Sequence, residues 1–186
     1  LGDKVVIQGA GALGLYAIAL AREMGATSVI VIDGLKERLR MAEEFGADYT
    51  LDLSEFESTD SRVEEIMNLT GGFGADLCIE VAGTPEAVPE GLQMLRRGGR
   101  YLEMGTIFKG AFTSIDISWL IMRALRIVGA RNYEPRHLAK ALDFLMKNRS
   151  KYPFKKLITK KYALAEINEA FKTALKRTEL RVAVTP

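Results

Sequence analysis

Short apolar runs alternate with amphipathic stretches along most of the chain. The continuous β-branched run Val29–Ile32, which ends in Asp33, is typical of a parallel strand buried on both faces. Similar apolar runs predict strands at 5–7, 49–51, 77–81, 100–104 and 126–128, and helical periodicity predicts helices at 12–24, 36–45, 62–69, 85–95, 117–124 and 136–147. Strands that alternate with helices over short connections predict an α/β fold with a doubly wound, six-stranded parallel sheet and helices on both faces.

The pattern changes after Pro153. We expect a strand at 157–159, a helix at 165–176 with Ile167, Ala170, Phe171 and Ala174 on one face, and a final strand at 182–184. These elements are not needed to complete a six-stranded sheet. We therefore predict two parts, a sheet domain at 1–150 and a C-terminal segment at 151–186.

The first predicted strand runs directly into the sequence Gly9-Ala10-Gly11-Ala12-Leu13-Gly14, and a helix begins within it. This strand, G-x-G-x-x-G loop and helix form the dinucleotide-binding pattern of the Rossmann fold. Gly9 allows the tight turn, Gly11 lets the backbone approach a pyrophosphate, and Gly14 lets the helix pack close to the strand. We expect Gly9, Gly11, Ala12, Leu13 and Gly14 to bind the cofactor.

Asp33 ends the second strand, nineteen residues after Gly14, where the pattern places an acid that binds the adenosine ribose. A 2′-phosphate there would meet a like charge, so we expect NAD to be preferred over NADP. Arg38, which we also assign to the cofactor site, and Lys36 could shield such a phosphate. The alternative interpretation is that the glycines only make a tight turn and Asp33 only caps the next helix.

Composition narrows the class of protein. The 186 residues are 48% hydrophobic and 27% charged, and the net charge of +2 is spread without the basic stripe of a nucleic-acid-binding protein. No apolar run is long enough to span a bilayer. The single cysteine, Cys78, excludes an internal disulfide framework and fits a cytoplasmic location. The start at Leu1, directly before a strand, suggests a piece of a longer protein.

An ordered set of motifs resembles the zinc-type medium-chain alcohol and polyol dehydrogenases. These are Gly2-Asp3-Lys4-Val5-Val6-Ile7 with the glycine loop, Phe45-Gly46-Ala47-Asp48, Asp76-Leu77-Cys78-Ile79-Glu80-Val81-Ala82-Gly83, Gly98-Gly99-Arg100 with Gly105, Ile127-Val128-Gly129, and 164–171. No single motif is specific, but the set covers nearly the whole chain.

The resemblance implies further cofactor contacts. It places Ala82 and Gly83 beside the adenosine, and Met104, Gly105 and Thr106 near the nicotinamide. Ala130 and Asn132 are expected beside the carboxamide, and Arg181 at the pyrophosphate. It also implies a homo-oligomer that forms through the strand around Ile127 and Val128.

The family holds its catalytic zinc on an N-terminal domain through cysteine, histidine and glutamate. A catalytic zinc needs about three protein ligands, and this chain has one cysteine and one histidine, far apart in sequence. We therefore expect this chain to bind NAD but not to oxidise alcohols, the zinc and the alcohol or polyol substrate belonging to the full-length enzyme. The segment 151–186 would pack on that other domain.

Two other functions share the glycine loop and acid. One is a regulatory NAD-binding module, which lacks the Gly98-Gly99 segment. The other is an AdoMet methyltransferase, whose loop follows an acid where this chain has Gln8. Tyr152 and Lys156 have the spacing of short-chain reductases, but Pro153 breaks the helix that this chemistry requires.

Overall fold

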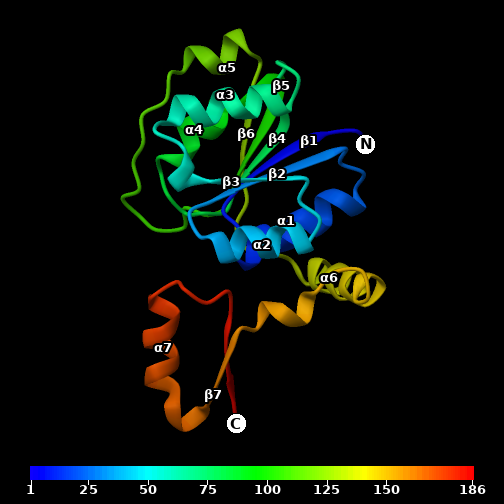
Figure 1. Ribbon diagram of the computed structural model, residues 1–186, viewed down its shortest axis with the longest axis vertical. Coiled ribbons are helices and arrows are strands. Elements are labelled where there is room, and N and C mark those ends of the chain that lie inside the picture. Colours follow the sequence, from blue (N-terminus) through cyan, green and yellow to red (C-terminus); the bar gives the residue numbers. More distant parts are fainter. The chain divides into compact units, whose positions relative to one another are not determined.

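The computed structural model describes residues 1–186 and divides them into two compact units, Leu1–Asn132 and Tyr133–Pro186 (Figure 1). Each unit is described by itself. The division falls before helix α6 (Pro135–Asn148), which the sequence-based boundary at residue 150 assigns to the first part.

The first unit contains a six-stranded parallel sheet with the strand order β3-β2-β1-β4-β5-β6. Its strands are β1 (Lys4–Gln8), β2 (Ser28–Asp33), β3 (Tyr49–Asp52), β4 (Ala75–Glu80), β5 (Leu95–Glu103) and β6 (Arg126–Gly129). This confirms the predicted doubly wound α/β fold. The order changes direction between β1 and β4, so the connections on either side of this point diverge and leave a crevice at the carboxyl ends of the strands.

Helices cover both faces of this sheet. They are α1 (Ala12–Glu23), α2 (Lys36–Glu44), α3 (Thr59–Leu69), α4 (Ala87–Met94) and the short α5 (Ser118–Met122). Figure 1 shows α1 and α2 on one face and α3, α4 and α5 on the other. None of these helices, nor any in the second unit, is both long and apolar enough to cross a membrane.

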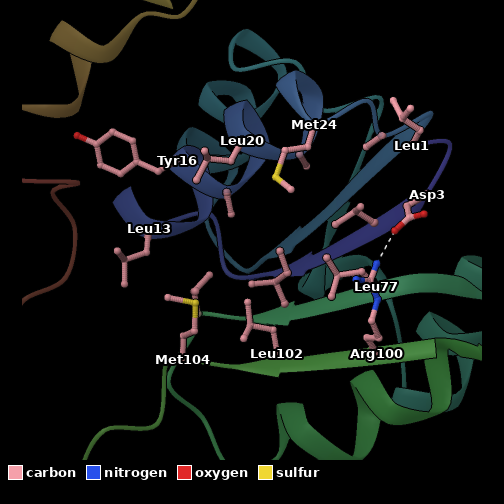
Figure 2. Close-up of a pocket in the computed structure, with 16 residues that line it drawn as sticks. Leu1, Asp3, Leu13, Tyr16, Leu20, Met24, Leu77, Arg100, Leu102 and Met104 are labelled. Carbon is pink, nitrogen blue, oxygen red and sulfur yellow. Dashed lines mark hydrogen bonds and ion pairs between the residues drawn. The ribbon is translucent and has the colours of Figure 1, made fainter. Parts of the chain in front are cut away.

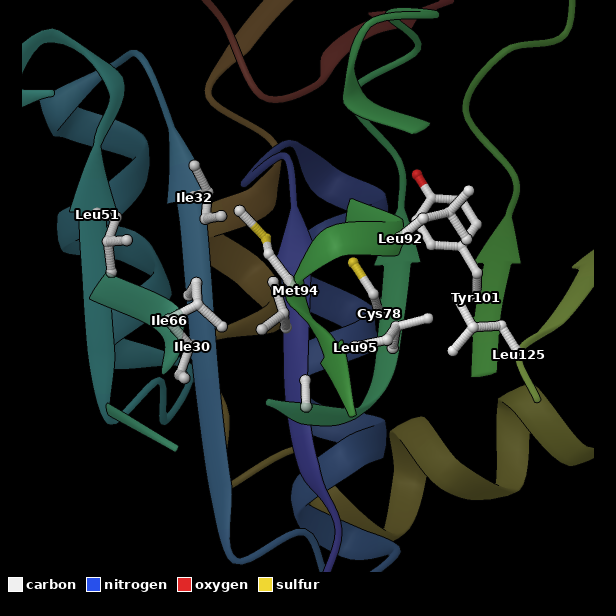
Figure 3. Packing of buried hydrophobic residues seen from close by; sticks show 12 residues of the cluster. Ile30, Ile32, Leu51, Ile66, Cys78, Leu92, Met94, Leu95, Tyr101 and Leu125 are labelled. Carbon is white, nitrogen blue, oxygen red and sulfur yellow. The ribbon is translucent and has the colours of Figure 1, made fainter. Parts of the chain in front are cut away.

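The main core lies between the sheet and the helices α3 and α4 (Figure 3). Ile30, Cys78 and Tyr101 contribute from three different strands, while Ile66 comes from α3 and Leu92 from α4. All five side chains are fully buried. The β-branched run of β2 therefore packs as the sequence predicts, because its strand is covered on both faces.

Helix α1 is apolar on nearly every side, and the sequence predicts that it is covered on more than one. Its inner side chains, including Leu15 and Ile18, are fully buried. Figure 2 shows Leu13, Leu20 and Met24 along a cavity of about 520 Å³ that is also lined by residues of β4 and β5. One flank of α1 thus lines a cavity instead of packing against a neighbouring element.

The second unit contains α6, the strands β7 (Lys160–Ala163) and β8 (Val182–Thr185), and helix α7 (Ile167–Leu175) between them. The two strands pair in parallel, which requires the helical crossover. The strand predicted at 157–159 is wrong: Phe154–Leu157 form a 3-10 helix and the strand begins at Lys160. In α7, Ala170 is buried while Phe171 is 64% exposed.

Candidate cofactor-binding site

The glycine loop connects β1 to α1 and is held by close backbone contacts. Gly9 has φ +106°, and a Cβ there would lie 2.8 Å from the backbone nitrogen of Ala82. A Cβ on Gly14 would overlap the carbonyl oxygen of Gly9, which would force α1 away from β1. Both positions therefore require glycine for packing.

Gly11 is in a different position, because the space above it is open. A Cβ there would meet only one atom within 4 Å, the Arg38 Nη1 at 3.9 Å. Helix α1 begins at the next residue, Ala12, and no side chain caps it. The N–H groups of its first turn have no intrahelical partner. Open space before uncapped helical N–H groups suits an anionic group such as a pyrophosphate.

Asp33 lies at the carboxyl end of β2 and is only 8% exposed. The Ala10 N–H of the glycine loop donates to its Oδ2 at 2.7 Å, and the Leu35 N–H, directly before α2, donates to its Oδ1 at 2.9 Å. Arg38 Nη1 lies 3.8 Å from the Asp33 Oδ2. The carboxylate therefore ties the loop to the start of α2. Each of its oxygens has a second lone pair that can accept from a ribose hydroxyl.

The other side of the crevice is formed by the turns after β4 and β5. Ala82 abuts Gly9, as described above. Gly83 has φ +78°, and a Cβ there would lie 2.9 Å from the carbonyl oxygen of Gly105. The structure therefore brings Ala82, Gly83, Met104, Gly105 and Thr106 to the same sheet edge as the glycine loop.

Ala130 follows β6, and its N–H donates to the carbonyl oxygen of Glu103 at 3.0 Å. With Met104 and Thr106 it lines a second cavity, of about 340 Å³. Asn132 has the left-handed φ of +63° and ends the first unit. Arg181 belongs to the second unit. Its role at the pyrophosphate stays a prediction.

Sequence reasoning missed three polar residues at this edge. Gln8, Glu80 and Glu103 are the last residues of β1, β4 and β5. Gln8 is 3% exposed and Glu80 is fully buried. The signal that could have found them is a polar residue at the last position of an otherwise apolar strand, since these positions meet at one edge of a parallel sheet.

The Gln8 side chain connects neighbouring elements through two buried hydrogen bonds. Its Nε2 donates to the Ala87 carbonyl oxygen at 2.9 Å, and its Oε1 accepts from the Tyr101 hydroxyl at 3.1 Å. This joins β1 to β5 and to the start of α4 below the crevice.

The structure gives no catalytic arrangement to Tyr152 and Lys156, and it gives His137 a structural role. Tyr152 is buried and precedes the 3-10 helix that contains Lys156, so the two do not share an α-helical turn. His137 Nδ1 accepts from the Glu134 N–H at 3.1 Å, which caps α6. No group of three or more His, Cys, Asp or Glu side chains is arranged to hold a metal ion.

Comparison with known proteins places this geometry in a family. Residues 12–147 match the family described as zinc-binding dehydrogenase. A sorbitol dehydrogenase from Halalkalibacterium halodurans is 32% identical to the chain, over 100% of the chain and 52% of its own length. The chain thus spans about half the length of the curated relatives that it matches first.

Solved structures agree. An alcohol dehydrogenase from Thermotoga maritima has a TM-score of 0.93 at 38% identity and covers 100% of this chain with 50% of its own. A Sinorhizobium meliloti protein described as a zinc-binding dehydrogenase, and solved with NADP bound, has a TM-score of 0.88 at 28% identity, covering 100% of this chain and 53% of its own. The chain belongs to the zinc-binding dehydrogenase family and corresponds to the cofactor-binding half of its alcohol and polyol dehydrogenases.

Proposed function

We propose that this chain binds NAD and positions its nicotinamide for hydride transfer from an alcohol or polyol. The observation that carries the proposal is the crevice between Gly11 and Asp33, where open space, uncapped helical N–H groups and a buried carboxylate lie together. Those three features match a pyrophosphate and an adenosine ribose. When bound, NAD supplies the hydride acceptor.

The preference for NAD over NADP rests on Asp33. Its carboxylate is buried and already accepts two backbone N–H groups, so it is held in place where a 2′-phosphate would bring a like charge. Arg38 acts in the opposite direction, because its guanidinium lies 3.8 Å from Asp33 and could pair with such a phosphate. Because the Sinorhizobium meliloti relative was solved with NADP bound, the preference between NAD and NADP is the part of the proposal to test first.

Around the nicotinamide, the contacts proposed are those at the ends of β4, β5 and β6. Ala82 and Gly83 would line the adenosine side, and Met104, Gly105 and Thr106 the ring. Ala130 and Asn132 would hold the carboxamide, and Arg181 would reach the pyrophosphate. Ala130, Met104 and Thr106 support this assignment because they already line one cavity.

We further propose that catalysis needs residues outside this chain. The catalytic zinc would polarise the alcohol oxygen as a Lewis acid, held by the half of the enzyme that the chain does not match. The isolated chain would then bind cofactor without oxidising alcohols, and 151–186 would pack on the other half. A cytoplasmic location is supported by the single, buried Cys78.

Calorimetric titration tests the assignment. We expect NAD to bind more tightly than NADP, and no heat from AdoMet. Tighter binding of NADP would contradict the role given to Asp33, and binding of AdoMet alone would favour the methyltransferase alternative, which the family match does not favour. We expect the isolated chain to bind NAD but not to oxidise alcohols, even when zinc is added. Alcohol oxidation by the isolated chain would contradict the proposal that catalysis needs residues outside it.

A further inference from the structure

The turns after β4 and β5 touch each other through two glycines. A Cβ on Gly83 would lie 2.9 Å from the Gly105 carbonyl oxygen, and a Cβ on Gly105 would lie 2.6 Å from the Gly83 nitrogen. No side chain can therefore separate the two turns. Both belong to the proposed cofactor crevice, so whatever holds them together also sets the width of that crevice.

The carboxyl group of Glu80 lies between these turns and binds both. The Gly83 N–H donates to its Oε1 at 2.6 Å, and the Gly105 N–H donates to its Oε2 at 3.1 Å. Glu80 is fully buried. A buried carboxyl group that accepts from two backbone N–H groups is a strong link, because water does not compete for these hydrogen bonds.

Glu103 faces this carboxyl group from the neighbouring strand, since the two residues are register partners. Its Oε1 accepts from the Thr106 N–H at 2.9 Å, and its Oε2 is buried and accepts no other hydrogen bond. Burial raises the pKa of Glu80, and a hydrogen bond with Glu103 and the charge of Glu103 raise it further, to about 7, against the opposing bonds from the Gly83 and Ala82 N–H groups.

The other polar groups on this side of the sheet are buried or paired. Burial raises the pKa of Cys78 well above its ordinary value, and burial raises that of Tyr101. Glu90 of α4 is paired with Arg62, whose Nε lies 2.5 Å from its Oε1. The neighbour on β1, Gln8, does not titrate. Among these groups, Glu80 is the one whose pKa is raised to about 7.

We propose that Glu80 is a positioning residue that holds the turn at Gly83 against the turn at Gly105, with Glu103 as its neighbour on β5, and that this link keeps the crevice at the width that the cofactor needs. The proposal rests on the proposed function for the identity of the ligand. The link itself is a property of the protein without ligand, which allows the two to be tested separately.

The first test compares Glu80→Gln with the wild-type chain. Glutamine offers one acceptor oxygen where the carboxyl group offers two, so one turn loses its bond. We expect hydrogen exchange at one of the two amides, that of Gly83 or that of Gly105, to become about tenfold faster, and NADH to bind about tenfold more weakly by fluorescence titration. Exchange at Val6 in β1 should be unchanged. Unchanged exchange at both glycines, or an unchanged affinity, would overturn the proposal.

Glu86→Gln is the matched control. Glu86 is an exposed acid near the same turn that makes no side-chain cap to α4. The substitution removes the same charge without touching either glycine, so exchange and affinity should stay at wild-type values. An equal loss of affinity in this control would show that net charge alone is responsible, which would also overturn the proposal.

Glu103→Gln keeps the inference testable if Glu80→Gln does not fold. The introduced glutamine can donate its amide to Glu80 and carries no charge, so the ionised form of Glu80 is favoured. The pH midpoint of the Gly83 and Gly105 amide resonances, about 7 in the wild type, should move to lower pH, because the contributions of Glu103 are removed while burial still raises the pKa. An unmoved midpoint would contradict the interaction between Glu80 and Glu103.

The two proposals can fail separately. If the wild-type chain binds neither NADH nor NADPH, the proposed function fails, while the exchange rates and the pH midpoint still decide whether Glu80 links the two turns.

Discussion

At the residue scale, Gly11 and Gly14 lie three positions apart and are required for different reasons. A side chain on Gly14 would collide with the backbone of Gly9, whereas one on Gly11 would enter open space. Gly14 therefore serves the packing of α1 on β1, and Gly11 serves the ligand. Substitution by the same small residue separates these two roles.

We expect Gly14→Ala to lower the free energy of unfolding by about 1–3 kcal/mol, as overpacked cores do. Gly11→Ala should lower it by less than about 1 kcal/mol, because its φ of −70° suits alanine. The same substitution should weaken NADH binding about tenfold or more by blocking the space above the loop. Urea unfolding and NADH titration of the two variants measure both effects. A Gly11→Ala variant that binds normally would show that the open space is not the pyrophosphate site.

Asp33→Ser tests cofactor choice at the same scale. Loss of the carboxylate removes the charged acceptor for the ribose and the repulsion toward a 2′-phosphate, and leaves Arg38 beside the site. The ratio of NADP to NAD dissociation constants should fall by about tenfold or more, the equivalent of one charge-assisted hydrogen bond. Competition titration of both cofactors against NADH measures it, and an unchanged ratio would exclude Asp33 as the selecting residue.

The pH dependence of stability follows from Glu80. Its pKa is raised from 4.5 to about 7 on folding, so the folded chain keeps the proton that the unfolded chain has lost. The favourable contribution is complete below pH 4.5 and is lost as the pH rises to about 7, with a size of about 3 kcal/mol. We expect the unfolding free energy of Glu80→Gln, relative to wild type, to rise between pH 5 and pH 8. Urea unfolding at both values checks this, and a constant difference would contradict it.

At the element scale, strand β2 was predictable because its continuous β-branched run has few alternatives. The start of α3 was missed because it depends on a capping box between Ser58 and Ser61 rather than on apolar periodicity. The strand at Lys160–Ala163 was missed because its pairing with β8 lies across the intervening α7. The sequence could not predict that Glu80 and Glu103 lie side by side, since this depends on the register of β4 and β5.

Helices α3 and α4 are joined by the ion pair between Arg62 and Glu90, whose side chains are 14% and 10% exposed. Arg62→Met should cost about 3 kcal/mol of unfolding free energy, because it leaves a buried carboxylate without its partner. The double variant with Glu90→Met should cost less than this single variant, since no unpaired charge remains. A double-mutant cycle in urea measures the coupling, and additive losses would show that the pair contributes nothing specific.

At the scale of the whole molecule, β6 is one of the two edge strands of the sheet, β3 being the other. It pairs only with β5, and Ile127 and Val128 are 40% and 53% exposed. Unpaired backbone groups along an apolar edge favour pairing with a second copy. We therefore propose a dimer that extends the sheet through β6.

Light scattering should report a dimer for the wild-type chain. Val128→Lys should shift it toward monomer, because two-fold pairing brings like charges close together across the strands. Lys161→Ala, on β7 of the second unit, is the control and should remain dimeric. A wild-type monomer, or a Val128→Lys variant that dimerises equally well, would contradict pairing through β6.

The fully buried Cys78 has a practical consequence. It is the only thiol of the chain, it sits in the centre of the sheet, and its raised pKa keeps it as the unreactive thiol. A thiol reagent can therefore modify the native chain only when the sheet opens. The labelling rate thus measures the rate of that opening. A cysteine introduced on the surface would be the single fast-reacting position, so a dye could be attached there without removing a native residue.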